Sequence, residues 1–129
     1  MMQHKIVARF LDGRVLKGVT LNFRPERRNF HMQLDDSGEQ VEVNVDELKS
    51  VFFVKDLTGN KDYTERKDVE RKGYGRRLEV KFVDGECIVG YTQGYSPDRP
   101  GFFMAPADPD SNNDRIYVVR ESTEAVNLL

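Results

Sequence analysis

Two stretches of similar sequence decide the fold: KIVARFLDGRVLKGVT at residues 5–20 and RLEVKFVDGECIVGYT at residues 77–92. In each stretch, apolar and polar side chains alternate on both sides of an Asp-Gly pair, Asp12-Gly13 in the first and Asp84-Gly85 in the second. Alternation with a period of two is typical of β-strands, and Asp-Gly supplies the positive φ angles of a tight hairpin turn. Each stretch therefore predicts a β-hairpin.

The similarity extends beyond the hairpins and forms an internal repeat. A shift of 72 residues aligns nine identical pairs, and later the shift grows to 75 because the second copy has three extra residues near 108–114. The repeat predicts a first module over 1–57, a charged linker over 58–76 and a second module over 77–129. The identical pairs are Phe10/Phe82, Asp12/Asp84, Gly13/Gly85, Gly18/Gly90, Thr20/Thr92, Pro25/Pro97, Arg27/Arg99, Phe30/Phe102 and Met32/Met104.

Each copy contains five short apolar or alternating runs separated by turn residues, and residues 46–49 of the first copy are typical of one helical turn. Five short antiparallel strands with one helical turn in about 50 residues predict a small closed or nearly closed barrel. The predicted fold class is therefore all-β, with two tandem five-stranded small barrels of the Sm-like or SH3-like kind. In the linker we expect a short exposed helix over 64–71, ended by Gly73 and Gly75.

Composition excludes several classes of protein. The chain has 129 residues, 33% of them charged, and a formal net charge of −2, which argues against a binder that works by phosphate neutralisation alone. No apolar run is long enough for a transmembrane helix, so no membrane partner is predicted, and Arg9 interrupts the apolar stretch that a signal peptide would need. A single cysteine, Cys87, fits a reducing cytoplasm.

The charge is unevenly distributed. Residues 1–56 have nine basic and nine acidic side chains, residues 57–76 have six and four, and residues 77–129 have five and nine. The first copy and the linker are therefore the places where we expect an anionic ligand.

The stretch VARFLDGRVLKGVTLNF at 7–23, followed by FHMQLDD at 30–36, resembles the first motif of the Sm and Sm-like proteins, which places two glycines five residues apart. The resemblance implies an Sm-like barrel, whose loop between the second and third strands holds RNA bases in that family. The family's Asp-x-x-Met-Asn loop is not reproduced here, and LKSVFFVKDL at 48–57 stands in place of its second motif.

Residues 84–119 resemble an uncharacterised group of bacterial domains more closely. That group has the pattern DGxxxxGxT, then SPxRPGFF, then DPxSNNxRIxVV, and this chain has DGECIVGYT, SPDRPGFF and DPDSNNDRIYVV. Members sometimes accompany PilZ and other signalling domains. The resemblance implies a fold and a bacterial setting, and no chemistry.

The loop between the second and third strands of each copy is the candidate ligand site. Guanidinium groups suit phosphate and aromatic faces suit stacked bases, so RNA or a nucleotide is the ligand that this loop predicts. The alternative is a structural turn at 96–101, in which Arg99 holds backbone carbonyls and prolines fix φ. The candidate residues are Arg24, Arg27, Arg28, Phe30, His31, Arg99 and Phe103.

Arg24 and Arg28 also have the spacing of the arginine pair with which PilZ domains bind cyclic di-GMP. The second half of the PilZ pattern requires Gly where this chain has Gln40. Two arginines at this spacing are common by chance, so the pair is a weak indication of a cyclic dinucleotide site.

A weak metal-site hypothesis rests on the oxygen-bearing side chains Asp108, Asp110, Asn112 and Asp114, whose alternate spacing matches the start of an EF-hand loop for Ca²⁺. The twelfth position of that loop is Val119, which cannot supply the bidentate carboxylate. The alternative is an Asx-rich turn whose side chains cap backbone groups.

No catalytic motif or cofactor fingerprint occurs in the sequence, so we predict neither an enzyme nor a cofactor. The run at 51–54 is apolar on both faces and 126–129 is its counterpart, which predicts that the copies pack on each other or on another subunit. We expect a non-catalytic binding or assembly module of a bacterial cytoplasm, with regulation as one role, protein partners or self-association, and RNA or nucleotide binding as the alternative. The candidate interface residues are Phe52, Val54, Asn127 and Leu129.

Overall fold

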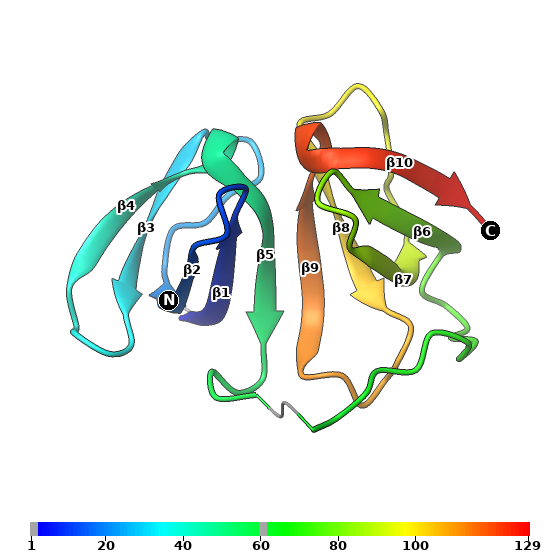
Figure 1. Cartoon of the computed structure of the whole chain (residues 1–129), viewed down its shortest axis with the longest axis horizontal. Coiled ribbons are helices and arrows are strands. Elements are labelled where there is room, and N and C mark those ends of the chain that lie inside the picture. The colour runs from blue at the N-terminus through cyan, green and yellow to red at the C-terminus, as the bar shows by residue number, and fades with distance from the viewer. Residues whose placement is uncertain (1–2, 60–61) are drawn as a thin grey trace.

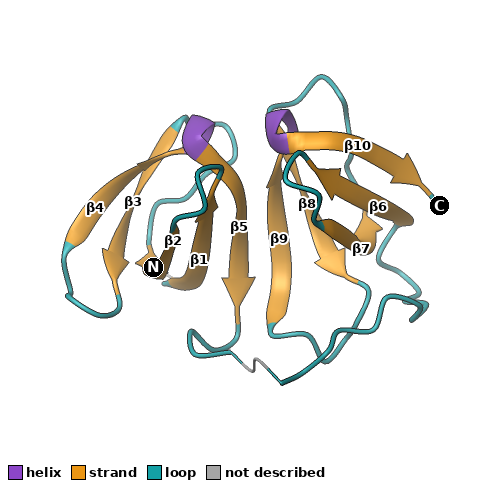
Figure 2. Ribbon diagram, in the orientation of Figure 1, coloured by secondary structure: helices purple, strands orange, loops and turns teal. Residues whose placement is uncertain are grey.

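The computed structural model describes residues 3–59 and 62–129, which form one antiparallel sheet of ten strands (Figures 1 and 2). The all-β prediction is confirmed, and the described residues contain no α-helix. The elements are β1 (His4–Phe10), β2 (Val15–Thr20), β3 (Asn29–Leu34), β4 (Gln40–Asn44), the 3-10 turn η1 (Val45–Glu47), β5 (Leu48–Val54), β6 (Arg76–Phe82), β7 (Cys87–Thr92), β8 (Gly101–Pro106), β9 (Asn113–Val119), the 3-10 turn η2 (Arg120–Ser122) and β10 (Thr123–Leu128).

The strand order is β10-β6-β7-β8-β9-β5-β1-β2-β3-β4, so β5 and β9 pair in the middle and β4 and β10 lie at the two edges. Strands β1 to β5 occupy one half of the molecule and β6 to β10 the other (Figure 1). The expectation of closed barrels is wrong in this respect, because the sheet is open. The edge of β5 that could have closed the first half bonds to β9 instead.

The two predicted hairpins are present, β1–β2 and β6–β7. Gly13 and Gly85 have φ angles of 95° and 93°, which is the left-handed region that glycine tolerates. Asp12 and Asp84 each accept a hydrogen bond from the backbone N–H two residues further on, at 2.9 and 3.0 Å. The two Asp-Gly pairs of the repeat therefore form the same kind of turn, one in each half.

The repeated threonines also have one role in both halves. The Thr20 hydroxyl donates a hydrogen bond to the carbonyl oxygen of His31 at 2.7 Å, and Thr92 donates to that of Phe103 at 2.8 Å. Backbone pairing is short here, since β2–β3 and β7–β8 each share only two paired positions. The threonine hydroxyls therefore bridge strands that have begun to separate.

The helical turn expected at 46–49 is present as η1, one residue earlier, with the Asn44 side chain accepting from the Asp46 N–H at 2.9 Å. The helix expected over 64–71 is absent. Polar contacts with the second half hold this segment in place of helical hydrogen bonds: the Tyr91 hydroxyl donates to the carbonyl of Val69, and Arg71 donates to that of Pro106, both at 3.0 Å. No described helix is long and apolar enough to span a bilayer.

The middle strands contribute side chains to both hydrophobic clusters of the sheet. Phe52 and Val54 of β5 pack in the cluster formed mainly by β6 to β9, whereas Tyr117 and Val119 of β9 pack in the cluster formed mainly by β1 to β5. The edge of β5 therefore pairs with β9, and the second apolar face of the run at 51–54 is covered by the cluster of the second half of the same chain.

The counterpart of that run lies elsewhere. Strand β10 pairs with β6 at the outer edge of the sheet, where Asn127 and Leu129 are exposed. Of the four candidate interface residues, the structure thus places Phe52 and Val54 inside the junction of the two halves and leaves the other two at a free edge.

Candidate functional site

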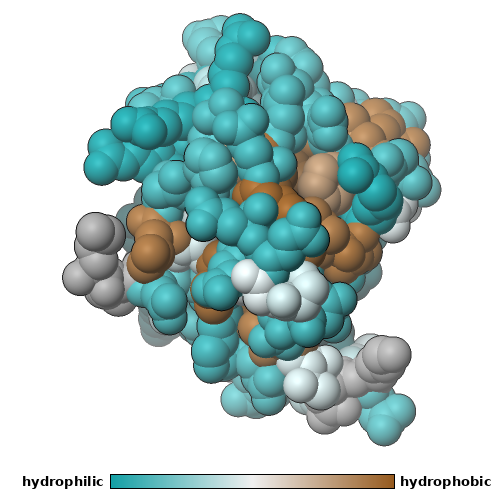
Figure 3. Space-filling model, turned by 90° about the vertical axis from the view of Figure 1, so that its left-hand side faces the viewer, coloured by the Kyte–Doolittle hydropathy of each residue, from teal (hydrophilic) through white to brown (hydrophobic). Residues whose placement is uncertain are grey.

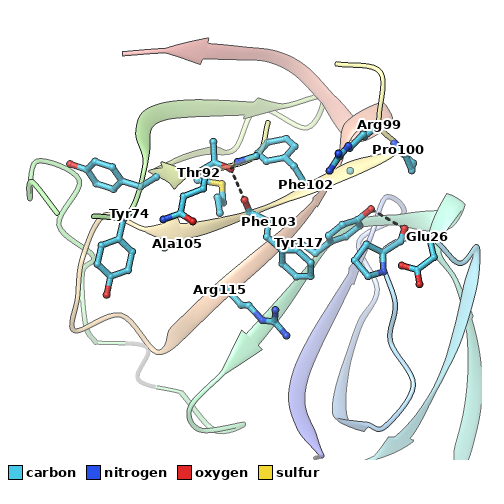
Figure 4. A pocket seen from close by; sticks show the side chains of 16 residues that line it. Glu26, Tyr74, Thr92, Arg99, Pro100, Phe102, Phe103, Ala105, Arg115 and Tyr117 are labelled. Carbon is cyan, nitrogen blue, oxygen red and sulfur yellow. Dashed lines mark hydrogen bonds between the residues drawn. The ribbon is translucent and has the colours of Figure 1, made fainter. Parts of the chain in front are cut away.

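A groove of about 770 Å³ runs along the junction of the two halves (Figure 4). Most of its lining comes from β8, β9 and the loop before β8. Pro25 and Glu26 contribute from the first half, and Tyr74 contributes from the segment between the halves. Three separate parts of the chain therefore meet in the groove, with the second half supplying most of the lining.

The wall of the groove is aromatic. Phe103 and Tyr117 are directly opposite each other on β8 and β9, with ring centroids 5.1 Å apart. Behind them Phe23 lies 5.3 Å from the Tyr117 ring, and Phe53 lies 5.9 Å from the Phe103 ring. Tyr117 is buried, whereas Phe103 is only half-buried and presents part of its ring to the groove. Such a network of rings holds the wall rigidly in place.

Arg115 of β9 borders this wall. Its guanidinium carbon lies 4.3 Å from the Phe53 ring centroid and 4.6 Å from that of Phe103, which are cation–π distances. Burial lowers the pKa of Arg115, and the nearby Asp114 carboxylate partly opposes this effect. Among the described residues, no carboxylate comes within ion-pair distance of the Arg115 side chain.

Arg99 lies on the other side of the Phe103–Tyr117 pair from Arg115 (Figure 4). It is exposed and, within the described ranges, also forms no ion pair. Among the described residues, Glu26 is the one carboxylate that lines the groove, and it adds to the effect of burial in raising the pKa of Tyr117. The groove therefore offers two cations to a ligand, with an aromatic surface between them.

The structure separates the candidate ligand residues of the first copy from one another. Phe30 is buried in the core, so its ring cannot receive a base. His31 is hydrogen-bonded to Asn22 and lies 3.6 Å from the carboxylate of Glu42, and Arg28 lies 3.9 Å from that of Asp46. Arg24 and Arg27 are exposed in the loop and flank the groove-lining residues 25 and 26 in the chain. Of the seven candidates, the groove is lined by Arg99 and Phe103.

Sequence reasoning missed Arg115, Tyr117 and Tyr74. The first two belong to a strand and the third to the segment between the halves, so a search confined to loops passed over them. The repeat could have indicated two of them, because Arg115 and Tyr117 align with the different residue types Gln40 and Glu42 of the first copy. Positions that differ between the copies are the ones that the common fold does not require.

Three residues of the metal hypothesis, Asp108, Asp110 and Asn112, take part in polar contacts within the chain. The buried carboxylate of Asp108 accepts hydrogen bonds from Tyr63 and from the guanidinium of Arg66, the latter at 2.9 Å, and Arg66 also lies 2.8 Å from Asp110. Asn112 donates to the backbone of Asp56 at 2.8 Å. No group of three or more Asp, Glu, His or Cys side chains suited to a metal occurs in the described ranges. The loop therefore holds the segment between the halves.

The comparisons with known proteins give a family but no activity. The chain belongs to the family of unknown function DUF6982, whose model matches residues 2–129. The expectation of an uncharacterised family is thus confirmed. Neither a curated protein nor a solved structure matches the chain.

Proposed function

We propose that this chain is a non-catalytic binding module built from two Sm-like or SH3-like five-stranded units, set edge to edge, in a bacterial cytoplasm. Support for the two units comes from the sequence repeat together with the shared roles of the repeated Asp-Gly and threonine residues. Strands β1 to β4 follow one another in the sheet, and so do β6 to β9, as expected of two copies of one unit.

The observation that carries the proposal is the junction groove. Its lining combines a half-buried ring, Phe103, with the guanidinium groups of Arg99 and Arg115, neither of which forms an ion pair in the described residues. Concave sites with an apolar wall and a few convergent polar groups are where small ligands bind. The ligand that fits these groups carries a negative charge and an aromatic or flat apolar part.

Titration with phenyl phosphate, followed by ¹H–¹⁵N NMR, tests this proposal. We expect saturable shifts of the backbone amides of Arg99, of residues 101–105 and of residues 115–117, and much smaller shifts with phenol, which lacks the charge. The Arg115→Ala variant should weaken the binding, whereas Lys17→Ala, which removes the same charge from an exposed position outside the groove, should not. Absence of shifts in the groove, or equal shifts with phenol, would contradict the proposal.

Assembly on a partner protein is the second candidate function. In the part of the chain that the structure describes, the edge strands β4 and β10 have no strand on their outer sides, and an extended segment of another protein can add to such an edge. The groove has the stronger support, because its lining differs from the equivalent surface of the first half, whereas the edge strands carry polar side chains such as Glu42 and Asn127.

A further inference from the structure

The arrangement of charge in the groove narrows the class of ligand. Arg99 and Arg115 lie on opposite sides of Phe103 and Tyr117 in Figure 4, so the aromatic wall has a cation at each end. A ligand that uses every part of this site has a flat ring and two anionic groups. A nucleotide unit with phosphates on both its 5′ and 3′ sides supplies these groups, with the two phosphates flanking the ribose and the base projecting from it.

Arg115 is the better prepared of the two cations. Its side chain is exposed, its guanidinium is stacked against Phe53 and Phe103, and it forms no ion pair with a carboxylate in the described residues. An incoming phosphate can form a paired, charge-assisted hydrogen bond with such a group at little further cost of ordering. The stacking fixes the plane of the guanidinium, and this favours a bidentate contact.

The groove is also flanked by basic segments at two places. Arg24 and Arg27 adjoin the lining residues Pro25 and Glu26 in the chain, and the Arg71 guanidinium lies 3.9 Å from the ring centroid of Tyr74. Cations along a path, with an aromatic surface between them, are typical of proteins that bind single-stranded nucleic acid.

We propose that the junction groove binds a nucleotide unit, with its base on Phe103 and its two phosphates on Arg99 and Arg115. This inference rests on the proposed function and goes further by naming the ligand chemistry. The unit can be a free nucleotide or part of a single strand, since both present the same ring and phosphates. The site differs from the one predicted in the first copy, whose Phe30 ring is buried.

Isothermal titration calorimetry of the full chain with adenosine 3′,5′-bisphosphate, adenosine 5′-monophosphate and adenosine tests the inference. We expect the bisphosphate to bind most tightly and adenosine least. Arg99→Ala and Arg115→Ala should each weaken bisphosphate binding about tenfold or more, as expected for the loss of a charged hydrogen bond. Phe103→Leu, which keeps an apolar side chain, should weaken it by at least about fivefold through lost stacking. Lys17→Ala is the matched control and should leave the affinity unchanged.

A twelve-residue oligouridylate distinguishes the two sources of this chemistry. Binding at least about tenfold tighter than that of the bisphosphate assigns the site to single strands, and comparable binding assigns it to free nucleotides; both support the inference. Bisphosphate binding that is no tighter than monophosphate binding, or that ignores Arg99→Ala and Arg115→Ala, overturns it. If phenyl phosphate binds in the groove but none of the nucleotides does, the inference falls and the proposed function stands. If phenyl phosphate fails as well, both fall.

Discussion

Lys49 of β5 donates a hydrogen bond at 2.8 Å to Asp84, which lies in the hairpin turn between β6 and β7. The same ammonium group lies 2.5 Å from Glu86 Oε1 and 4.7 Å from the ring centroid of Phe82. The Lys49 side chain is only 7% exposed, whereas the two carboxylates are 52% and 40% exposed. This contact therefore joins the two halves by charge at one end of the junction, next to the apolar pairing of β5 with β9.

Replacing Lys49 by methionine should destabilise the chain by about 1–2 kcal/mol, which is less than the loss of a fully buried pair because the carboxylates stay hydrated. Methionine keeps the packing on Phe82 and removes the charge. Urea denaturation measures the free energy of unfolding. Lys81→Met, which breaks an exposed pair with Glu124, is the control and should change it by no more than about 0.5 kcal/mol. Equal effects of the two variants would contradict the role given to Lys49.

The same contact predicts a pH dependence. The hydrogen bond from Lys49 is the main cause that holds the pKa of Asp84 below its ordinary value, so the folded state binds a proton less readily than the unfolded state. This stabilisation is fully present above the unfolded pKa of about 3.9 and is lost as pH falls through the folded value. Melting temperatures measured from about pH 6 down to about pH 3 should fall less steeply for Lys49→Met than for the wild type.

Gly18 and Gly90 mark places where the neighbouring strand leaves no room for a side chain. A Cβ on Gly18 would overlap the carbonyl oxygen of Gln33, and one on Gly90 would overlap that of Ala105. Backbone would have to move in both cases, so alanine at either position should destabilise the chain by about 2 kcal/mol or more. Gly94→Ala is the control, since a Cβ there meets nothing within 4 Å, and it should be neutral or slightly stabilising. Urea denaturation of the three variants makes the comparison.

The repeat made much of the fold predictable from the sequence, because Gly13 with Gly85 and Thr20 with Thr92 are identical for local reasons of turn and strand geometry. The pairing of β5 with β9 was not predictable, because residues 51–54 show only that both faces need cover and not which strand provides it.

The candidate site was predictable only in part, for a related reason. Arg99 and Phe103 follow turn residues that the sequence displays, but Arg115 reaches the same groove only through the pairing of β8 with β9. Conversely, Phe30 looked available for stacking in a basic loop, yet the alternation along β3 turns its ring into the core.

The buried carboxylate of Asp108 should hold the segment between the two halves. It accepts hydrogen bonds from Tyr63, from Arg66 and from the Asp110 N–H, and the Arg66 hydrogen bond is the main cause that lowers its pKa. Asp108→Asn should therefore speed amide hydrogen exchange at residues 62–71 several-fold, as measured by mass spectrometry. Asp114→Asn, at an exposed position, should leave the exchange unchanged.

The lowered pKa of Asp108 also predicts how the order of this segment depends on pH. A lowered carboxyl pKa means that the contacts persist at neutral pH and are lost in acid, so the wild-type segment should loosen as the pH falls through the folded pKa. Calcium should not raise the melting temperature, because Arg66 already pairs with Asp108 and Asp110. Calcium stabilisation that Asp108→Asn abolishes would instead support the EF-hand comparison.

The free edges of the sheet differ from the junction in a way that limits self-association. In the alignment of the two copies, Glu42 of β4 corresponds to Tyr117 of β9, and Asn127 of β10 corresponds to Phe52 of β5. Tyr117 and Phe52 lie on the two strands that pair at the junction. The outer face of the first half is largely hydrophilic (Figure 3). Polar and charged residues on edge strands oppose pairing with another chain. The cover that residues 51–54 require already comes from the second half of the same chain.

We therefore expect the wild-type chain to be monomeric in multi-angle light scattering. The double variant Glu42→Tyr with Asn127→Phe should associate with increasing concentration, because it restores the apolar side chains of the junction to both edges. A junction of this kind joins different surfaces, so its repetition between chains generates open or ring-shaped assemblies rather than two-fold dimers. Glu39→Tyr with Asn127→Phe adds the same side chains but places the tyrosine in the turn before β4, and it should stay monomeric. A wild-type oligomer whose size the edge variant does not alter would show that another surface drives association.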